Sequence, residues 1–129
     1  MPTLTGPVLI VDDDSAVRQS LKFALEQEDL EVRLYGSGPQ LLADSRLPLG
    51  GCLVIDYAMP GMDGIVLLGR LRKRHVELPA ILITSPASPR LRMRALLAGF
   101  RQVLEKPLED GALLDGIHGA LTASMQHSS

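Results

Sequence analysis

The sequence contains little cysteine and few aromatic residues. Among 129 residues there are one cysteine, no tryptophan, two phenylalanines and two tyrosines. A single cysteine excludes an intrachain disulfide framework and a cysteine-rich metal site, and the setting of Cys52 in GCLVID favours a small buried side chain. So few aromatic rings provide no platform on which nucleic-acid bases could stack. We therefore predict an aliphatic core and no direct nucleic acid binding by this domain.

Long apolar runs and a large charge of one sign are also absent. No apolar run is long enough to cross a bilayer, and the first residues, MPTLTGP, contain neither a basic region nor an apolar signal core. The formal net charge of −2 gives no reason to expect a polyanionic partner. With 46% hydrophobic and 22% charged residues, the composition is typical of one compact domain. We expect a cytoplasmic protein without a membrane partner.

Short apolar runs alternate with helical patterns along the chain. We predict strands at residues 8–11, 30–35, 52–55, 80–84 and 102–105, and the helical patterns that follow them lie around residues 17–25, 39–45, 64–75, 89–98 and 114–121. The runs at 52–55 and 80–84 are continuously apolar, as in strands that are covered on both faces. This alternation predicts an α/β fold, a single doubly wound domain with a parallel sheet between two helix layers.

Local signals mark the ends of several of these helices. Either Asp14 or Ser15 can cap the first helix, and for Asp14 we favour this role over a part in a binding site. Either Asp63 or Gly64 opens the third helix. Gly99 is typical of the residue that ends a helix.

Polar side chains follow four of the five predicted strands. The residues concerned are Asp12 and Asp13 after the first strand, Asp56 after the third, Thr84 at the end of the fourth, and Glu105, Lys106 and Pro107 at the end of the fifth. In doubly wound sheets, ligands bind outside the carboxyl ends of the strands. We therefore expect these side chains to share one rim of the sheet.

The carboxylates of Asp12, Asp13 and Asp56 need a positive partner, because mutual repulsion and desolvation both oppose their burial. Oxygen ligands with open positions suit Mg²⁺, which keeps several waters and shares its shell with phosphate groups. A lysine and a hydroxyl beside such an ion can position and neutralise a phosphoryl group. The residues thus predict phosphoryl chemistry with Mg²⁺ as the cofactor.

Four motifs, VDDDSAVRQSL, VIDYAMPGMDG, ILIT and VLEKPLED, occur in this order. Together they resemble the receiver domain of two-component response regulators, and the first and last are most similar to the FixJ-type branch. The resemblance covers about residues 7–122. It implies one receiver domain over residues 1–129, with a polar tail at 123–129. The implied fold is a flavodoxin-like (βα)5 domain whose five parallel strands lie in the order 2-1-3-4-5.

The resemblance also implies roles for individual residues. Asp56 would be the phosphoacceptor, attacking the phosphorus of a phosphohistidine to form an acyl phosphate. Asp13, Asp56 and the backbone carbonyl of Ala58 would bind Mg²⁺ directly, with help from Asp12.

Two further residues would act on the phosphoryl group once it is bound. Lys106 would pair with its oxygens, and the Lys106–Pro107 bond resembles the cis peptide of the family. Thr84 would donate a hydrogen bond to the phosphoryl group and draw the following loop inward.

The sequence departs from the family pattern at the switch. Three residues before Lys106 the family usually has Tyr or Phe, whose ring moves with the threonine, but here the residue is Val103. The switch then runs either through the loop and the fourth helix alone or partly through Phe100. Ala58 and Pro86 lack the polar side chains that orient a hydrolytic water in the family. We therefore expect an acyl phosphate that is not especially short-lived.

The implied partner is a sensor histidine kinase or a phosphotransfer protein. Dimerisation through the fourth helix, fifth strand and fifth helix is a further expectation, as is a following output domain that binds DNA. The sequence offers three alternative functions. Val103 supports a receiver-like interaction domain with weak or no phospho-switching. An aspartate-nucleophile phosphatase would need a second acid where this chain has Ala58. A flavodoxin-like cofactor binder would need Gly, Ser and Thr residues to bind phosphate in the first strand-to-helix turn, where this chain has three aspartates. We do not expect an enzyme acting on external substrates.

Overall fold

A computed structural model describes residues 6–108 and 111–127. Strands and helices alternate throughout this part of the chain. The elements are β1 (Val8–Val11), α1 (Ser15–Glu26), β2 (Val32–Tyr35), α2 (Gly38–Ala43), β3 (Cys52–Asp56), α3 (Gly64–Lys73), β4 (Ala80–Thr84), α4 (Pro89–Ala98), β5 (Gln102–Glu105) and α5 (Ala112–His127).

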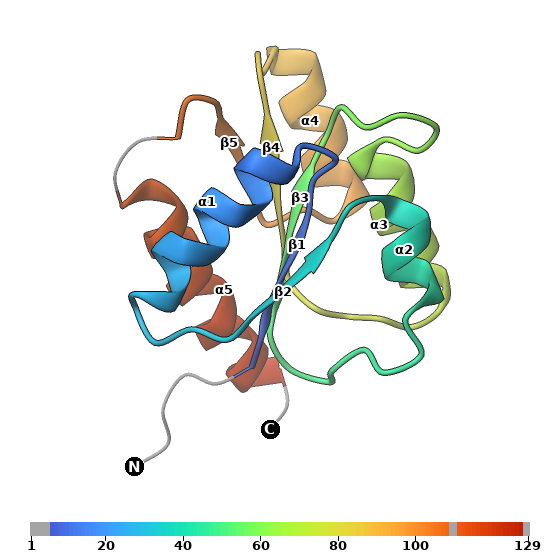
Figure 1. Cartoon of the computed structure of the whole chain (residues 1–129). Coiled ribbons are helices and arrows are strands. Elements are labelled where there is room, and N and C mark those ends of the chain that lie inside the picture. The colour runs from blue at the N-terminus through green and yellow to red at the C-terminus, as the bar shows by residue number, and fades with distance from the viewer. Residues whose placement is uncertain (1–5, 109–110, 128–129) are drawn as a thin grey trace.

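The strands form one parallel sheet in the order β2-β1-β3-β4-β5 (Figure 1). Helices α1 and α5 cover one face of this sheet, and α2, α3 and α4 cover the other (Figure 1). The predicted doubly wound fold and strand order are confirmed. Within the described residues, no helix is both long and apolar enough to cross a membrane.

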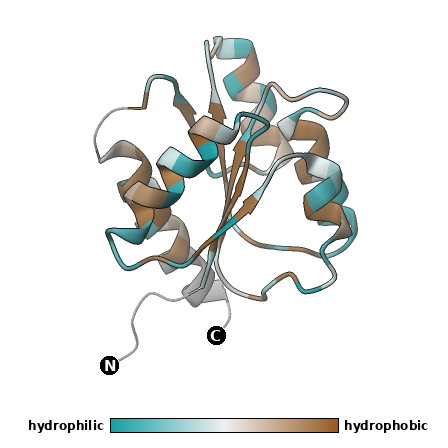
Figure 2. Ribbon diagram, viewed as in Figure 1, coloured by the Kyte–Doolittle hydropathy of each residue, from teal (hydrophilic) through white to brown (hydrophobic). Residues whose placement is uncertain are grey.

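Side chains from β1, β3 and β4 point alternately into two separate cores. Leu9, Leu53 and Leu82 pack against α2, α3 and α4. Ile10 and Val54 pack on the opposite face, against α1 and α5. These three strands are buried along their whole length, because each is covered on both faces. Figure 2 shows the central strands as the most continuously hydrophobic part of the ribbon.

Polar caps determine where helices begin. The carboxylate of Asp14 accepts hydrogen bonds from the backbone amides of the first turn of α1, so Asp14 rather than Ser15 is the cap. Asp63 caps α3 in the same way and leaves Gly64 as the first helical residue. Gly99 ends α4 with a positive φ of 111°, the left-handed conformation that glycine adopts without strain.

Two other features bear on the expectations from sequence. Cys52 is fully buried, and desolvation raises the pKa of its thiol to about 12, as suits a small core residue. Helix α5 extends to His127 and so includes residues 123–127 of the stretch expected as a polar tail. Residues 128–129 of that stretch lie outside the described residues.

A prediction follows from the close approach of α3 to β3. A Cβ atom on Gly64 would lie 2.8 Å from the backbone oxygen of Asp56 and 2.8 Å from Cδ1 of Leu82. Substituting Gly64→Ala should therefore lower the free energy of unfolding by about 1–3 kcal/mol, because the end of β3 must shift. Urea denaturation monitored by circular dichroism measures the change.

Gly69 provides a matched control on the same helix. Within the described residues, a Cβ atom there would meet no atom within 4 Å outside its chain neighbours and the nearby backbone of α3. Gly69→Ala should raise the free energy of unfolding by up to about 1 kcal/mol, because alanine is the better helix former at an open position. Equal effects of the two substitutions would contradict the proposed contact at Gly64.

Candidate functional site

The end of β1 places two aspartates at the rim of the sheet. The chain leaves the buried run Val8–Val11 directly into Asp12, whose side chain is buried, and Asp13, which is exposed. Asp12 extends the sheet by one residue, since its backbone N–H donates to the carbonyl of Tyr35 at 3.1 Å. Its Oδ1 accepts a hydrogen bond from the backbone N–H of Asp14 at 2.9 Å, which fixes the carboxylate.

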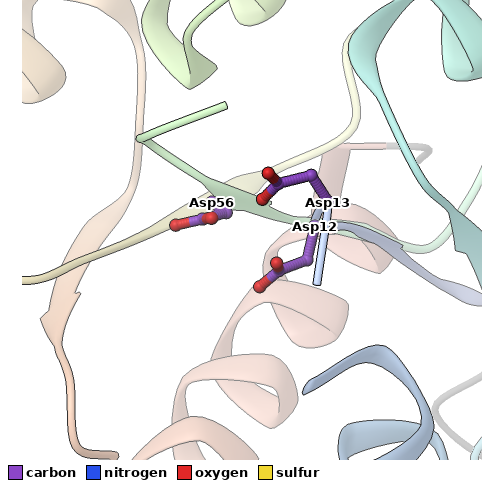
Figure 3. Close-up of side chains that lie close together, drawn as sticks. All are labelled: Asp12, Asp13 and Asp56. Atoms are coloured by element: carbon purple, nitrogen blue, oxygen red, sulfur yellow. The ribbon is translucent and has the colours of Figure 1, made fainter. Parts of the chain in front are cut away.

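The sheet register brings Asp56 to the same place. Val11 pairs with Ile55, so the residues that follow them, Asp12 and Asp56, lie side by side at the carboxyl edge of the sheet. Asp56 is the last residue of β3 and is 6% exposed. Carboxylate oxygens of Asp12, Asp13 and Asp56 lie within 4.8 Å of one another, as Figure 3 shows for the gathered side chains.

Lys106 supplies positive charge to this cluster from the end of β5. Its Nζ lies 3.5 Å from Oδ1 of Asp56 and 3.7 Å from Oδ2 of Asp12. Its backbone N–H donates to the carbonyl of Thr84 at 2.8 Å, which fixes the start of the loop after β5. The Lys106–Pro107 peptide bond is cis, as the resemblance implied.

Three neighbouring carboxylates and one ammonium group leave an excess of negative charge. All three donors are oxygens, the ligands that Mg²⁺ prefers, and a dication would balance the excess. Asp12, Asp13 and Asp56 therefore fit a magnesium site. The fourth predicted ligand, the backbone carbonyl of Ala58, belongs to an exposed residue two positions after Asp56, and its binding role remains a prediction.

Thr84 brings a hydroxyl to the same rim from β4. It is buried, and its Oγ1 donates to the carbonyl of Pro86 at 3.3 Å, within its own loop. The Ser85–Pro86 peptide bond is also cis. Among the residues that the structure describes, this is the one hydrogen bond of the Thr84 hydroxyl.

The surroundings of Asp56 disfavour its charged form. Desolvation by burial raises the pKa of Asp56, and repulsion from Asp12 raises it further. Lys106 acts in the opposite direction through its charge and its hydrogen bond. The net direction is upward, so the cluster favours a proton or another cation at Asp56.

The two candidate switch residues differ in position: Val103 lies within β5, and Phe100 precedes this strand. Val103 is buried in the core beneath α4 and pairs with Leu82. Phe100 is also buried, but it precedes β5 at the opposite edge of the sheet. Five residues separate Phe100 from Glu105, which corresponds to roughly 16 Å along a strand. This distance favours a switch through the loop and α4 over one through Phe100.

Two further residues contact the site from outside the carboxylate cluster. The sequence placed Glu105 on the rim without a contact of its own, and it did not indicate Arg18. A guanidinium nitrogen of Arg18 donates to the backbone carbonyl of Asp12 at 2.6 Å. The carboxylate of Glu105 accepts a hydrogen bond from the backbone N–H of Ala87, in the loop after Thr84, at 3.1 Å. The only sequence signal for either was position, since Arg18 lies one turn into α1 and Glu105 directly precedes Lys106.

Known proteins share both the sequence pattern and the fold. A family model described as response regulator receiver domain matches residues 8–118. The transcriptional regulatory protein FixJ of Azorhizobium caulinodans is 37% identical over 121 residues, which cover 93% of this chain and 57% of FixJ. The C4-dicarboxylate transport transcriptional regulatory protein DctD of Pseudomonas aeruginosa is 38% identical over 114 residues, 88% of this chain and 25% of DctD.

Solved structures agree with these relatives. The crystal structure of FixJ-N superposes with a TM-score of 0.81 at 35% identity, covering 95% of this chain and 96% of FixJ-N. The response regulator StyR superposes with a TM-score of 0.87 at 35% identity, covering 95% of this chain and 62% of StyR. The chain therefore spans little more than half the length of FixJ and most of the separate unit FixJ-N.

The raised pKa of Asp56 generates a prediction about stability. The folded protein holds a proton on Asp56 more tightly than the unfolded chain does, so this group stabilises the fold below its unfolded pKa of about 3.9 and loses that effect as pH rises through the folded pKa. In metal-free buffer, Asp56→Asn should therefore be more stable than the original protein near neutral pH. Lys106 retains Asp12 as a partner in the variant.

Urea denaturation of both proteins in EDTA, at about pH 3 and about pH 7, measures this difference. The advantage of Asp56→Asn should grow as pH rises between these values. A difference that stays constant with pH, or that favours Asp56 at neutral pH, would contradict the assigned environment.

Proposed function

Because this chain belongs to the response regulator receiver domain family, we propose that it is a phosphorylation-controlled switch with Asp56 as the phosphoacceptor. The donor is a phosphohistidine on a sensor histidine kinase or a phosphotransfer protein. The observation that carries the proposal is the convergence of Asp12, Asp13 and Asp56 at the carboxyl edge of the sheet, with Lys106 beside Asp12 and Asp56. Each side chain comes from a strand end, and together they offer both a nucleophile and charge compensation.

The reaction is a transfer of the phosphoryl group from nitrogen to oxygen. A carboxylate oxygen of Asp56 attacks the phosphorus, the bond between phosphorus and the histidine nitrogen breaks, and the imidazole leaves with that electron pair. The product is an acyl phosphate on Asp56. Burial favours this chemistry, because it keeps the carboxylate poorly solvated and reactive.

The other residues of the rim would hold and neutralise the group. Asp12, Asp13, Asp56 and the backbone carbonyl of Ala58 would hold Mg²⁺, which when bound neutralises charge on the transferring oxygens. Lys106 would remain paired with the site by binding a phosphoryl oxygen in place of the Asp56 carboxylate.

Thr84 is the residue through which the phosphoryl group would reach the surrounding fold. Its hydroxyl would leave the carbonyl of Pro86 and donate to a phosphoryl oxygen, moving the loop between β4 and α4. The resulting state would be read by a partner or by a second copy through α4, β5 and α5.

The proposal extends to the chain as a whole. Residues 1–129 would form one receiver domain with its core at about 7–122, act in the cytoplasm and turn over no external substrate. An output domain that binds DNA would be the target of the switch in a longer protein of the FixJ type.

Mass spectrometry of the intact protein tests the proposal directly. Incubation with acetyl phosphate and Mg²⁺ should add one phosphoryl group, because acetate is a good leaving group and the site supplies the nucleophile. Asp56→Asn should take none, and EDTA should abolish the reaction of the original protein. Lys106→Met should slow it by about 100-fold, the usual cost of losing one group that stabilises the transition state.

Gly69→Ala is the control, since Gly69 lies on α3 away from the cluster and should leave the rate unchanged. An undiminished adduct in Asp56→Asn, or no adduct in the original protein, would remove Asp56 as phosphoacceptor. Turnover of a small phosphate ester with Mg²⁺ would instead favour an aspartate-nucleophile phosphatase.

The lifetime of the acyl phosphate is a separate prediction. Ala58 and Pro86 are exposed beside the site and carry no side-chain hydrogen-bonding group that could orient a hydrolytic water. The phosphorylated protein should therefore decay over minutes or longer, and Ala58→Gln should shorten the lifetime several-fold. Intact-mass measurements after removal of acetyl phosphate follow the decay, and a lifetime of seconds in the original protein would contradict this view.

A further inference from the structure

Glu105 connects three elements next to the candidate site. It is the last residue of β5, directly before Lys106. One carboxylate oxygen accepts the backbone N–H of Ala87, in the loop between β4 and α4, at 3.1 Å. The other lies 3.7 Å from a guanidinium nitrogen of Arg92, in α4. A single side chain thus holds both the loop and the helix that follows it.

Arg92 makes a second contact with the same strand. Its other guanidinium nitrogen donates to the backbone carbonyl of Val103 at 3.2 Å. Because this contact uses a carbonyl, it does not depend on the size of the side chain at position 103. Arg92 and Glu105 therefore tie the first turn of α4 to β5. We call these contacts, from Ala87 and Arg92 to Glu105 and Val103, the Glu105 bridge.

The Glu105 bridge lies at the edge of an open groove. The groove has a volume of about 440 Å³ and is lined by Arg92, Val103, Leu104, Glu105, Lys106, Pro107, Leu108 and Ala112. The two charged side chains of the bridge are 43% and 47% exposed. Water competes for ion pairs of this kind, which are usually weak, so the bridge can break without a large cost.

Thr84 lies at the start of the same loop. Its hydroxyl donates to the carbonyl of Pro86, and the backbone N–H of the next residue, Ala87, donates to Glu105. A movement of Thr84 toward Asp56 pulls on residues that the Glu105 bridge holds against β5. The two sets of contacts therefore compete for one short segment of backbone.

We propose that Glu105 and Arg92 are positioning residues that hold the β4–α4 loop and α4 in the resting arrangement, and that phosphorylation acts by breaking the Glu105 bridge. This inference rests on the proposed function of Asp56. The bridge provides a route from Thr84 to the surface of α4 that needs no aromatic ring on β5. Removing it shifts the population toward the arrangement that accepts the phosphoryl group.

Phosphorylation rates with acetyl phosphate and Mg²⁺ test this inference. Glu105→Ala and Arg92→Gln should each react about three- to fivefold faster than the original protein, which is the scale expected for loss of a partly exposed bridge. The double variant should be no faster than the faster single variant, because both changes remove the same contacts. Glu105→Gln, which retains an oxygen for the Ala87 amide, should lie between Glu105→Ala and the original protein.

Arg94→Gln is the matched control. Arg94 is exposed on the same helix and forms no ion pair within the part of the chain that the structure describes. Its substitution removes the same charge but none of the bridge, so the rate should stay within about 1.5-fold of the original. Equal rates in Arg92→Gln and Arg94→Gln, or slower reaction of Glu105→Ala, would overturn the inference. If Glu105→Ala fails to fold, Glu105→Gln and Arg92→Gln decide between these outcomes.

Hydrogen exchange at the Ala87 amide provides a measurement that needs no phosphorylation. Without phosphorylation, the Ala87 amide of the Glu105→Ala variant should exchange several-fold faster than the same amide of the Arg94→Gln variant. Unchanged exchange would overturn the bridge even if Asp56 is phosphorylated. Absence of any adduct in the original protein would overturn the proposed function while leaving the exchange result to be judged by itself.

Discussion

The pairing of one ammonium group with two buried carboxylates is the interaction on which the rest of this molecule depends. Lys106 lies between Asp12 and Asp56 and partly offsets their repulsion, while Asp13 adds a further negative charge. One cation is too few to neutralise three carboxylates, so the cluster of the folded protein retains an excess of negative charge. Burial raises the pKa of Asp56, and repulsion from Asp12 raises it further. The excess negative charge suits the rim to a divalent ion, and that ion together with Lys106 would offset the charge of a phosphoryl group. An arrangement fully neutralised by the protein itself would bind such an ion only weakly.

The parallel sheet delivers these groups to one place. Because β1, β3, β4 and β5 run in the same direction and in register, the residues that follow them meet at one edge. The buried strands hold that edge rigidly, since each is packed on both faces. The loop after β4, in contrast, is tied to the fold by individual polar contacts from Thr84 and Glu105. The rigid carboxylate cluster thus lies next to a loop that can move, as a conformational switch requires.

Much of the fold and of the candidate site could be predicted from the sequence, because short stretches of residues indicate where each strand ends. Asp12 and Asp56 follow continuous apolar runs, so their place at strand ends follows from the pattern, and doubly wound topology places strand ends together. The sequence limited the N-terminal cap of α1 to Asp14 or Ser15, and the hydrogen bonds in the structure identify it as Asp14. The contacts of Arg18 and Glu105 could not be predicted, because they depend on helix rotation and on side-chain rotamers, which composition and spacing do not encode. The binding role of the Ala58 carbonyl and the part that Val103 takes in switching remain predictions for the same reason.

The solitary thiol in the middle of the sheet has a practical consequence. Cys52 is fully enclosed, and its sulfur stays protonated under ordinary conditions. Alkylating reagents attack the thiolate, so they reach it only when β3 separates from its neighbours. The rate at which Cys52 is alkylated in the native protein therefore measures how often the sheet opens. A second cysteine introduced on the exterior would serve as a unique attachment point for a fluorophore or spin label, with no need to delete the first.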